Sequence, residues 1–308
     1  MRTVILHYHI YKNAGTSFDH VLTHNFGGRH ELFDGPFPFF TIDQDQLDRI
    51  IMRRPQAVAF SSHQIVLPAP SSLDYRALAA IFVRNPFLRI ASIYRFKRGP
   101  ERPDGTPLAV LSPEDLQAEL ARQALEAQRA ANPTAGPDLP PPDPLPAPQF
   151  DMTSTAQAAR KHDMVGWIEH CLNSRTEVVH VSNAQTRFFA SPYRMRPLHK
   201  RSVDGLAYDI GTALRTLSGV ELLGRTEQFE ADVARFGDIL APHGLTLNLP
   251  EDTRHNVTHA GTDSTAERVE AMLAALSPDL RGRLIRANRQ DSALYDRACA
   301  LIERDHRI

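Results

Sequence analysis

Cysteine is nearly absent from this sequence: its 308 residues include only Cys171 and Cys299. Two isolated thiols exclude a disulfide framework and a cysteine-rich zinc site, and they fit a reducing compartment. Long apolar runs are also absent, since none approaches the roughly 18 residues that cross a bilayer. The first expected strand begins at residue 3, which leaves no room for a signal peptide. These absences predict a cytoplasmic protein without a transmembrane segment.

The sequence has no excess of charge of either sign. It carries 35 Lys and Arg residues against 36 Asp and Glu residues, a formal net charge of −1. Any anion-binding site must therefore come from local clustering of basic residues, and we expect no nucleic-acid partner. Hydrophobic residues make up 42% and charged residues 23%, an ordinary composition for a globular protein, which excludes disorder as the main state.

The most informative stretch is TVILHYHIYKNAGTS, residues 3–17. Thr3–Ile10 is apolar and β-branched enough to predict a strand, and the FDHVL that follows the polar loop predicts a helix. A helix N-terminus offers backbone N–H groups and the positive end of its dipole to an anion. We expect Lys12 to supply a point charge beside a phosphate cradle made by Asn13, Ala14, Gly15, Thr16 and Ser17. Lys12 precedes the glycine by three positions, so the GxxxxGK[ST] loop of ordinary ATPases does not fit.

Two further apolar runs end in polar clusters. Ala57–Phe60 predicts a strand that is followed by Ser-Ser-His-Gln, and polar groups at such strand ends often form the ligand site of open α/β sheets. His63 in this cluster is therefore a candidate site residue. Ala77–Val83 predicts another strand, followed by Arg84 and then by a helix that Asn85 caps. Six Lys and Arg residues lie between positions 84 and 102, against one acid, and form a local patch that attracts anions.

Strands that alternate with helices predict an α/β fold with a mainly parallel sheet and helices on both faces. A capping box predicts a helix from Ser264, and Thr226 is the expected N-cap of another helix. The proline-rich stretch at about 100–148 predicts a surface insertion that either covers the site as a lid or is mobile. The other expected elements are helices over Gln44–Arg53, Phe87–Phe96, 112–131, Met164–Leu172 and Asn183–Phe189, strands over Glu177–Val181 and Val220–Gly224, and a loop over Gly27–Phe40.

The pair YKNAGTS and RNPFLRIAS, in this order, resembles the signature of sulfotransferases that use 3′-phosphoadenosine 5′-phosphosulfate (PAPS). Three further stretches are similar to the carbohydrate branch of that family, which includes the heparan sulfate uronosyl 2-O-sulfotransferases: NAQTRFF, LLGRTEQFEADV and NRQDSALY, at 183–189, 223–234 and 288–295. The resemblance spans roughly residues 3–96 and 177–295 and is that of a bacterial-type soluble member. Asn85 departs from it, because many relatives carry aspartate there, and the usual luminal membrane anchor is missing.

The resemblance implies a P-loop-like single domain over residues 1–308 that transfers a sulfuryl group from PAPS to a hydroxyl, with a carbohydrate or other hydroxyl-bearing compound as acceptor. It implies that His63 is the general base and that Lys12 neutralises the bridging oxygen of the donor. Residues 13–17 would hold the 5′ phosphate, and Arg84 and Ser92 the 3′ phosphate. No metal ion is expected. His9 and Arg187 are secondary candidates for ligand contact, whereas Arg89 is expected to be structural.

Two alternatives stay open at this stage. A P-loop small-molecule kinase would need magnesium and would ignore the 3′ phosphate, and a nucleotide-binding protein without catalytic activity would use His63 only structurally. His255 and His259 are four residues apart, but the Asn-Val-Thr between them favours a loop over a metal-binding helix. The sequence does not specify the acceptor or the oligomeric state, because acceptor pockets are built from loops and insertions.

Overall fold

A computed structural model describes residues 1–37, 40–131, 146, 148–190, 200–202, 204–251 and 263–305. The chain forms two units, one made of Met1–Ala91 with Cys171–Ile308 and the other of Ser92–His170. The second unit includes the predicted insertion, of which residues 132–145 and 147 lie outside the described residues, as do His255 and His259. The expectation of a single domain over 1–308 stays a prediction.

A five-stranded parallel sheet forms the centre of the first unit. Its strands are β1 (Arg2–Tyr8), β2 (His30–Leu32), β3 (Ala59–Ser62), β4 (Tyr75–Val83) and β7 (Leu222–Arg225), in the order β2-β3-β1-β4-β7. Every neighbouring pair is parallel, so the carboxyl ends of all five strands lie at one edge. The predicted α/β fold is confirmed, and the polar clusters that follow β1, β3 and β4 meet at this edge.

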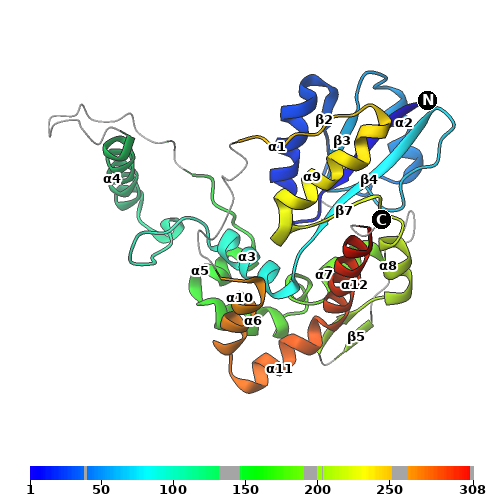
Figure 1. Ribbon diagram of the computed structural model, residues 1–308. Coiled ribbons are helices and arrows are strands. Elements are labelled where there is room, and N and C mark those ends of the chain that lie inside the picture. The colour runs from blue at the N-terminus through cyan, green and yellow to red at the C-terminus, as the bar shows by residue number, and fades with distance from the viewer. Residues whose placement is uncertain are drawn as a thin grey trace. The chain divides into compact units, whose positions relative to one another are not determined.

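Helices cover both faces of the sheet, as Figure 1 shows. On one face, α1 (Gly15–Phe26) and α9 (Phe229–Leu240) pack Phe18 and Phe236 against strand residues such as Ile5. The alternate strand residues, such as Val4, face the other helices. These are α2 (Gln44–Met52), α7 (Ala184–Phe189), α8 (Ile210–Leu217) and α12 (Arg289–Asp305). Because successive strand side chains point to opposite faces, one apolar strand supplies both core layers.

The remaining elements of the first unit are α10 (Thr265–Ala274), α11 (Pro278–Ala287), and an antiparallel pair of β5 (Lys200–Ser202) and β6 (Gly205–Ala207). Helix α3 (Pro86–Arg98) begins in the first unit and continues into the second, and α6 (Met164–Asn173) runs from the second into the first. The second unit also contains α4 (Pro113–Ala131) and α5 (Ser154–Lys161). Short 3-10 helices cover Gly27–Arg29, Leu108–Val110, Glu177–His180, Thr226–Gln228 and Ala241–His243.

Three sequence predictions about local structure are wrong. The strand predicted over Glu177–Val181 is a 3-10 helix over Glu177–His180, because three valines among five residues also fit a short buried helix, in which Val178 packs into the core. The loop predicted over Gly27–Phe40 contains the edge strand β2. Thr226 opens a 3-10 turn rather than capping α9, which begins at Phe229.

Two predicted helix caps are confirmed. Asn85 Oδ1 accepts a hydrogen bond of 3.1 Å from the Phe87 backbone N–H, and Pro86 is the first residue of α3. Ser264 and Glu267 form the predicted capping box at the start of α10. Each cap satisfies backbone N–H groups that a helix leaves without an internal partner, so the sequence located these helix ends correctly.

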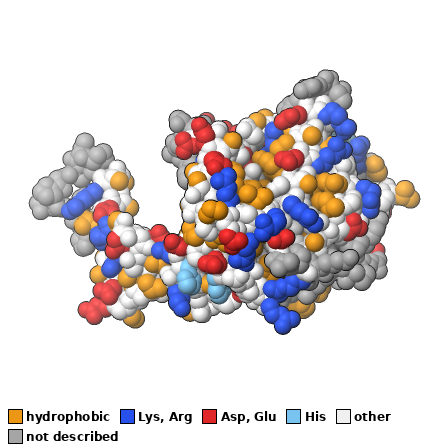
Figure 2. Space-filling view, turned by 90° about the horizontal axis from the view of Figure 1, so that it is seen from below, with side chains coloured by type: hydrophobic (Ala, Val, Ile, Leu, Met, Phe, Trp, Pro, Cys, Tyr) orange, Lys and Arg blue, Asp and Glu red, His pale blue; other side chains and the backbone are white. Residues whose placement is uncertain are grey.

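Basic side chains do not gather into one continuous surface on the face seen in Figure 2, where acidic and apolar side chains separate them. This mixture matches the formal net charge of −1. None of the helices in the described part of the chain has the length and apolar character needed to cross a membrane.

Candidate functional site

The loop between β1 and α1 has an unusual backbone conformation. Lys12 and Ala14 adopt positive φ angles of 64° and 60°, in the left-handed region that residues with a Cβ seldom enter. Helix α1 then begins at Gly15 without a side-chain cap and without an acidic residue in its first turn. The positive end of the helix dipole and the first backbone N–H groups are therefore available to an anion, with Lys12 beside them.

A buried amide network holds this loop in place. Asn13 is 1% exposed, and its Nδ2 donates to the Phe82 carbonyl (2.9 Å) and to Gln185 Oε1 (2.7 Å). Gln185 Oε1 also accepts from the Arg84 backbone N–H (2.9 Å), and Gln185 Nε2 donates to the Arg84 carbonyl (2.8 Å). One glutamine from α7 thus links the loop after β1 to the residue that follows β4.

Two arginines of the predicted patch add further contacts to the loop. Arg84 Nη1 donates to the Lys12 carbonyl and Arg89 Nε to the Tyr11 carbonyl, each at 3.1 Å. Arg84 is 8% exposed, and its Nε lies 4.0 Å from Glu227 Oε1. The structure therefore brings Lys12 and Arg84 together. Ser92 is buried on α3 but belongs to the second unit, so its pairing with Arg84 stays a prediction.

The starts of α7 and α12 cap each other. The Asp291 carboxylate accepts from the backbone N–H groups of Gln185 (3.0 Å) and Thr186 (2.7 Å). In return, Asn183 Oδ1 accepts from the backbone N–H groups of Gln290 (3.0 Å) and Asp291 (3.1 Å). The stretches NAQTRFF and NRQDSALY therefore position Gln185 against the loop, while the side chain of Arg187, a secondary candidate, is exposed.

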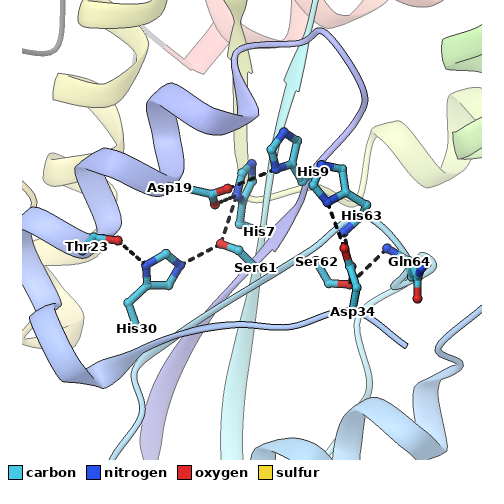
Figure 3. Close-up of polar contacts among 10 residues, drawn as sticks. All are labelled: His7, His9, Asp19, Thr23, His30, Asp34, Ser61, Ser62, His63 and Gln64. Carbon is cyan, nitrogen blue, oxygen red and sulfur yellow. Dashed lines mark hydrogen bonds and ion pairs between the residues drawn. The ribbon is translucent and has the colours of Figure 1, made fainter. Parts of the chain in front are cut away.

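A second network, made of histidines and carboxylates, lies at the ends of β1 and β3 (Figure 3). His7 Nδ1 donates to Asp19 Oδ1 (2.7 Å), and His9 Nδ1 donates to Asp19 Oδ2 (3.1 Å). Ser61 Oγ lies 3.1 Å from His7 Nδ1 and 2.8 Å from His30 Nε2. Asp19, from the first turns of α1, thus joins two histidines that share one face of β1.

His63 lies at the solvent-exposed end of this network. Its Nδ1 lies 3.2 Å from Asp34 Oδ2, and Asp34 Oδ1 accepts from the His63 backbone N–H (2.9 Å). Its ring stacks on the ring of His9, with centroids 3.9 Å apart. The side chain is 51% exposed and lines a cavity of about 310 Å³. Nδ1–H donation to Asp34 leaves the Nε2 lone pair of His63 directed away from Asp34.

Burial sets the charge states of this network. Burial, followed by the nearby His9, lowers the pKa of His63, which keeps its imidazole neutral at pH 7 despite Asp34. Burial also lowers the pKa of His7, and it lowers that of His30 to about 4. Burial alone would raise the pKa of Asp19, but hydrogen bonds from His7 and His9 outweigh it and hold the pKa below its usual range. The network is therefore a carboxylate surrounded by imidazoles.

His7, His9 and Asp19 also form the one group in the described part of the chain whose ligand atoms could surround a metal ion, lying within 4.8 Å of one another. Each of the two Nδ1 atoms forms a hydrogen bond with one oxygen of Asp19, so these atoms have partners without an ion. The sequence predicts no metal ion.

Sequence reasoning missed the carboxylates and the amide that hold the site together. Asp19, Asp34 and Gln185 gave no signal of their own, because their roles depend on partners between 10 and 172 positions away. Asp19 follows Gly15 by four residues, so it shares a helix face with the loop glycine, and this spacing could have identified it.

No family model matches this chain. The chain is similar to an uncharacterized protein of Archaeoglobus fulgidus, with 23% identity over 303 residues that cover 96% of each chain. A similarity of this length extends over most of the second unit as well as the first.

Proposed function

We propose that this protein is a sulfotransferase that moves a sulfuryl group from PAPS to a hydroxyl of a carbohydrate or another acceptor. One arrangement supports the proposal: an uncapped helix start with a lysine before its glycine lies beside a histidine at the end of the neighbouring strand. Tyr8 of β1 pairs with Ser62 of β3, so the phosphate-binding loop and His63 begin side by side. A group-transfer enzyme needs this pairing of an anion site and a base.

The roles of the residues follow from their chemistry. His63 removes the proton of the acceptor hydroxyl through Nε2, while Asp34 holds its other nitrogen. The acceptor oxygen forms a bond to sulfur as the bond from sulfur to the 5′ phosphate oxygen breaks. Lys12 and the backbone N–H groups of residues 14–17 stabilise the charge that develops on the leaving phosphate. The proton on His63 then passes to solvent.

Arg84 and Ser92 are assigned to the 3′ phosphate, which distinguishes PAPS from ATP. Arg84 already forms an ion pair with Glu227, so a phosphate would bind beside this pair. Calorimetry that compares adenosine 3′,5′-bisphosphate with magnesium-ATP tests this assignment. We expect tighter binding of the bisphosphate, whereas tight magnesium-ATP binding without regard to the 3′ phosphate would favour a small-molecule kinase.

Incubation with radiolabelled PAPS and a panel of glycosides and lipid-linked sugars tests the activity. We expect a labelled acceptor together with adenosine 3′,5′-bisphosphate, and Lys12→Ala should abolish both because its charge would act on the leaving group. If the protein binds the donor but forms no product with any acceptor, the proposed activity is refuted. The alternative of a nucleotide-binding protein without catalytic activity would then be favoured.

A further inference from the structure

The cavity beside His63 has a distinct chemical character. Its lining includes the carboxylates of Asp19 and Asp34, while Leu32 and Phe33 supply an apolar wall. No lysine or arginine is among the described residues that line it. A hydroxyl compound that approaches His63 therefore meets negative charge, hydroxyl groups and an apolar surface.

An acceptor that enters this cavity comes close to Asp34, which lines it beside His63. This carboxylate is 41% exposed and is held in place by bonds to His63 and to Ser62 Oγ (2.7 Å). Asp19, the second carboxylate, is 14% exposed at the same cavity. Two like charges within a few ångströms of an acidic acceptor repel it strongly where water is partly excluded.

The size and the apolar wall of the cavity add a second restriction. A volume of about 310 Å³ is at the lower end of the range for ligand sites, so it fits a small molecule or the end of a glycan. Phe33 packs edge-on against Phe60, with ring centroids 6.4 Å apart, which fixes its ring. A fixed aromatic surface next to hydroxyl groups suits a compound with one apolar and one polar side.

We infer that the acceptor is a small hydroxyl compound or glycan end without negative charge. This inference rests on the proposed sulfotransferase activity and narrows it. The resemblance implies only a carbohydrate or another hydroxyl-bearing acceptor, and the lining of this cavity selects against the acidic ones. Carboxylated and sulfated sugars should therefore be poor acceptors.

Phenyl β-glucoside and phenyl β-glucuronide form a test pair, since they differ only at C6, which is a hydroxymethyl group in the first and a carboxylate in the second. We expect kcat/KM for the glucoside to exceed that for the glucuronide by about ten-fold or more, from repulsion at a few ångströms. Asp34→Asn keeps the shape and should reduce this ratio at least about three-fold, even though overall activity falls. Glu31→Gln makes the same charge change outside the cavity and should leave the ratio unchanged.

Equal or better use of the glucuronide would overturn the inference. If wild-type protein turns over neither compound, saturation-transfer NMR in the presence of adenosine 3′,5′-bisphosphate compares their binding instead. Equal binding, or no binding of either, also counts against the inference. Failure of the proposed activity is recognised separately, because then no acceptor of any charge releases the bisphosphate from PAPS.

A different observation carries a second inference, which concerns His9. The ring of His9 lies across the first residue of α1, where a Cβ on Gly15 would be 2.1 Å from His9 Nε2. The other nitrogen of the ring, Nδ1, forms a hydrogen bond with Asp19, and the ring of His63 stacks on the ring of His9. The same Cβ would be 1.9 Å from His9 Cδ2, so the ring edge that carries Cδ2 and Nε2 lies against the helix start that we assign to the donor. It also lies next to the base that we assign to the acceptor.

We propose that His9 is a catalytic residue that, with both ring nitrogens protonated, donates Nδ1–H to Asp19 and Nε2–H to the sulfuryl group. Asp19 positions the ring for this contact, because it holds Nδ1 while the edge with Nε2 lies against the start of α1. This role also rests on the proposed activity. It explains why the loop needs a glycine at position 15 although the residue is helical and has no positive φ.

Two substitutions separate this role from a structural one. The amide of His9→Gln places a donor near the position of Nε2, whereas the amide of His9→Asn retains the contact near Nδ1 with Asp19. We expect both variants to bind adenosine 3′,5′-bisphosphate within a few-fold of wild type. Glutamine should keep kcat at least about ten-fold above the asparagine variant. The reverse order, or equal loss in both, would make His9 a structural partner of Asp19.

Discussion

The two sides of the candidate site are built from different chemical groups. The side assigned to the donor is held by amides and arginines, with Asn13 and Gln185 fully buried and bonded to backbone atoms. The side assigned to the acceptor is held by titratable groups, with Asp19 between two imidazoles and Asp34 on a third. The first side fixes the backbone, and the second sets proton positions.

This difference has an energetic meaning. Buried amide hydrogen bonds to the backbone stabilise one loop conformation, and their removal leaves several polar groups without partners. The hydrogen bonds between a carboxylate and imidazoles stabilise the fold less at low pH, because their contribution to the free energy of unfolding depends on the protonation of each ring. We therefore expect substitutions on the donor side to change stability and those on the acceptor side to change turnover.

The largest expected effect on the acceptor side comes from His63→Ala. Removal of a general base should lower kcat by about 10²- to 10⁴-fold, while the affinity for adenosine 3′,5′-bisphosphate stays within two-fold. Steady-state kinetics and calorimetry measure the two quantities, with the exposed His24→Ala on α1 as the control. A comparable loss of donor affinity would show that the two sides are not separable.

Gln185→Ala should produce the largest loss of stability. It removes the partners of the Arg84 backbone N–H and carbonyl and one of the two partners of Asn13 Nδ2, all at buried positions. At about 1–3 kcal/mol for each orphaned group, with partial relaxation, the free energy of unfolding should fall by about 3–5 kcal/mol. Urea denaturation measures this loss, and Gln117→Ala on the exposed face of α4 should change stability by less than about 0.5 kcal/mol. A change as small as that of the control would contradict the role of Gln185.

The fold could be predicted from the sequence because local signals agreed with it. Apolar runs of strand length, the Asn85 cap and the Ser264 capping box each depend on neighbouring residues alone. The edge strand β2 was missed because it has only three residues, too few to show an alternation of apolar and polar side chains, and it lies between glycine- and proline-rich segments. The strand predicted over Glu177–Val181 was wrong because a short segment with three valines fits more than one conformation.

The candidate site divides in the same way. The positions of Lys12, His9 and His63 follow from where strands end, which the sequence indicates. The spacing of Asp19 from Gly15 indicates only the helix face on which it lies, and its contact with His9 is tertiary. No local pattern encodes the choice of Gln185 as the partner of Asn13. Charge states are equally hidden, since burial is the main cause of the lowered pKa values of His7 and His63.

Gly15→Ala tests the point where the two sides meet. The added methyl group would overlap the His9 ring, which can shift only by disturbing Asp19 or the stacked His63. We expect a loss of about 1–3 kcal/mol in the free energy of unfolding, typical of overpacking. Donor affinity and turnover should both fall, unlike in His63→Ala. Gly28→Ala has open space around its Cβ and should be tolerated, so equal effects of the two substitutions would show that His9 does not pack on the loop.

The smallest expected effect is a change in the pH dependence of stability. The folded protein holds the pKa of His30 at about 4, below its ordinary value of 6.5, so the unfolded chain binds a proton that the folded chain does not. This contribution to stability is complete above pH 6.5 and is lost as the pH falls towards 4. His30→Gln should reduce the loss between pH 7 and 4 by on the order of 1 kcal/mol, after allowance for solvent screening. His7 and His63 act in the same direction, so part of the slope should persist in urea denaturation series. An unchanged slope would show that His30 is not held neutral by the fold.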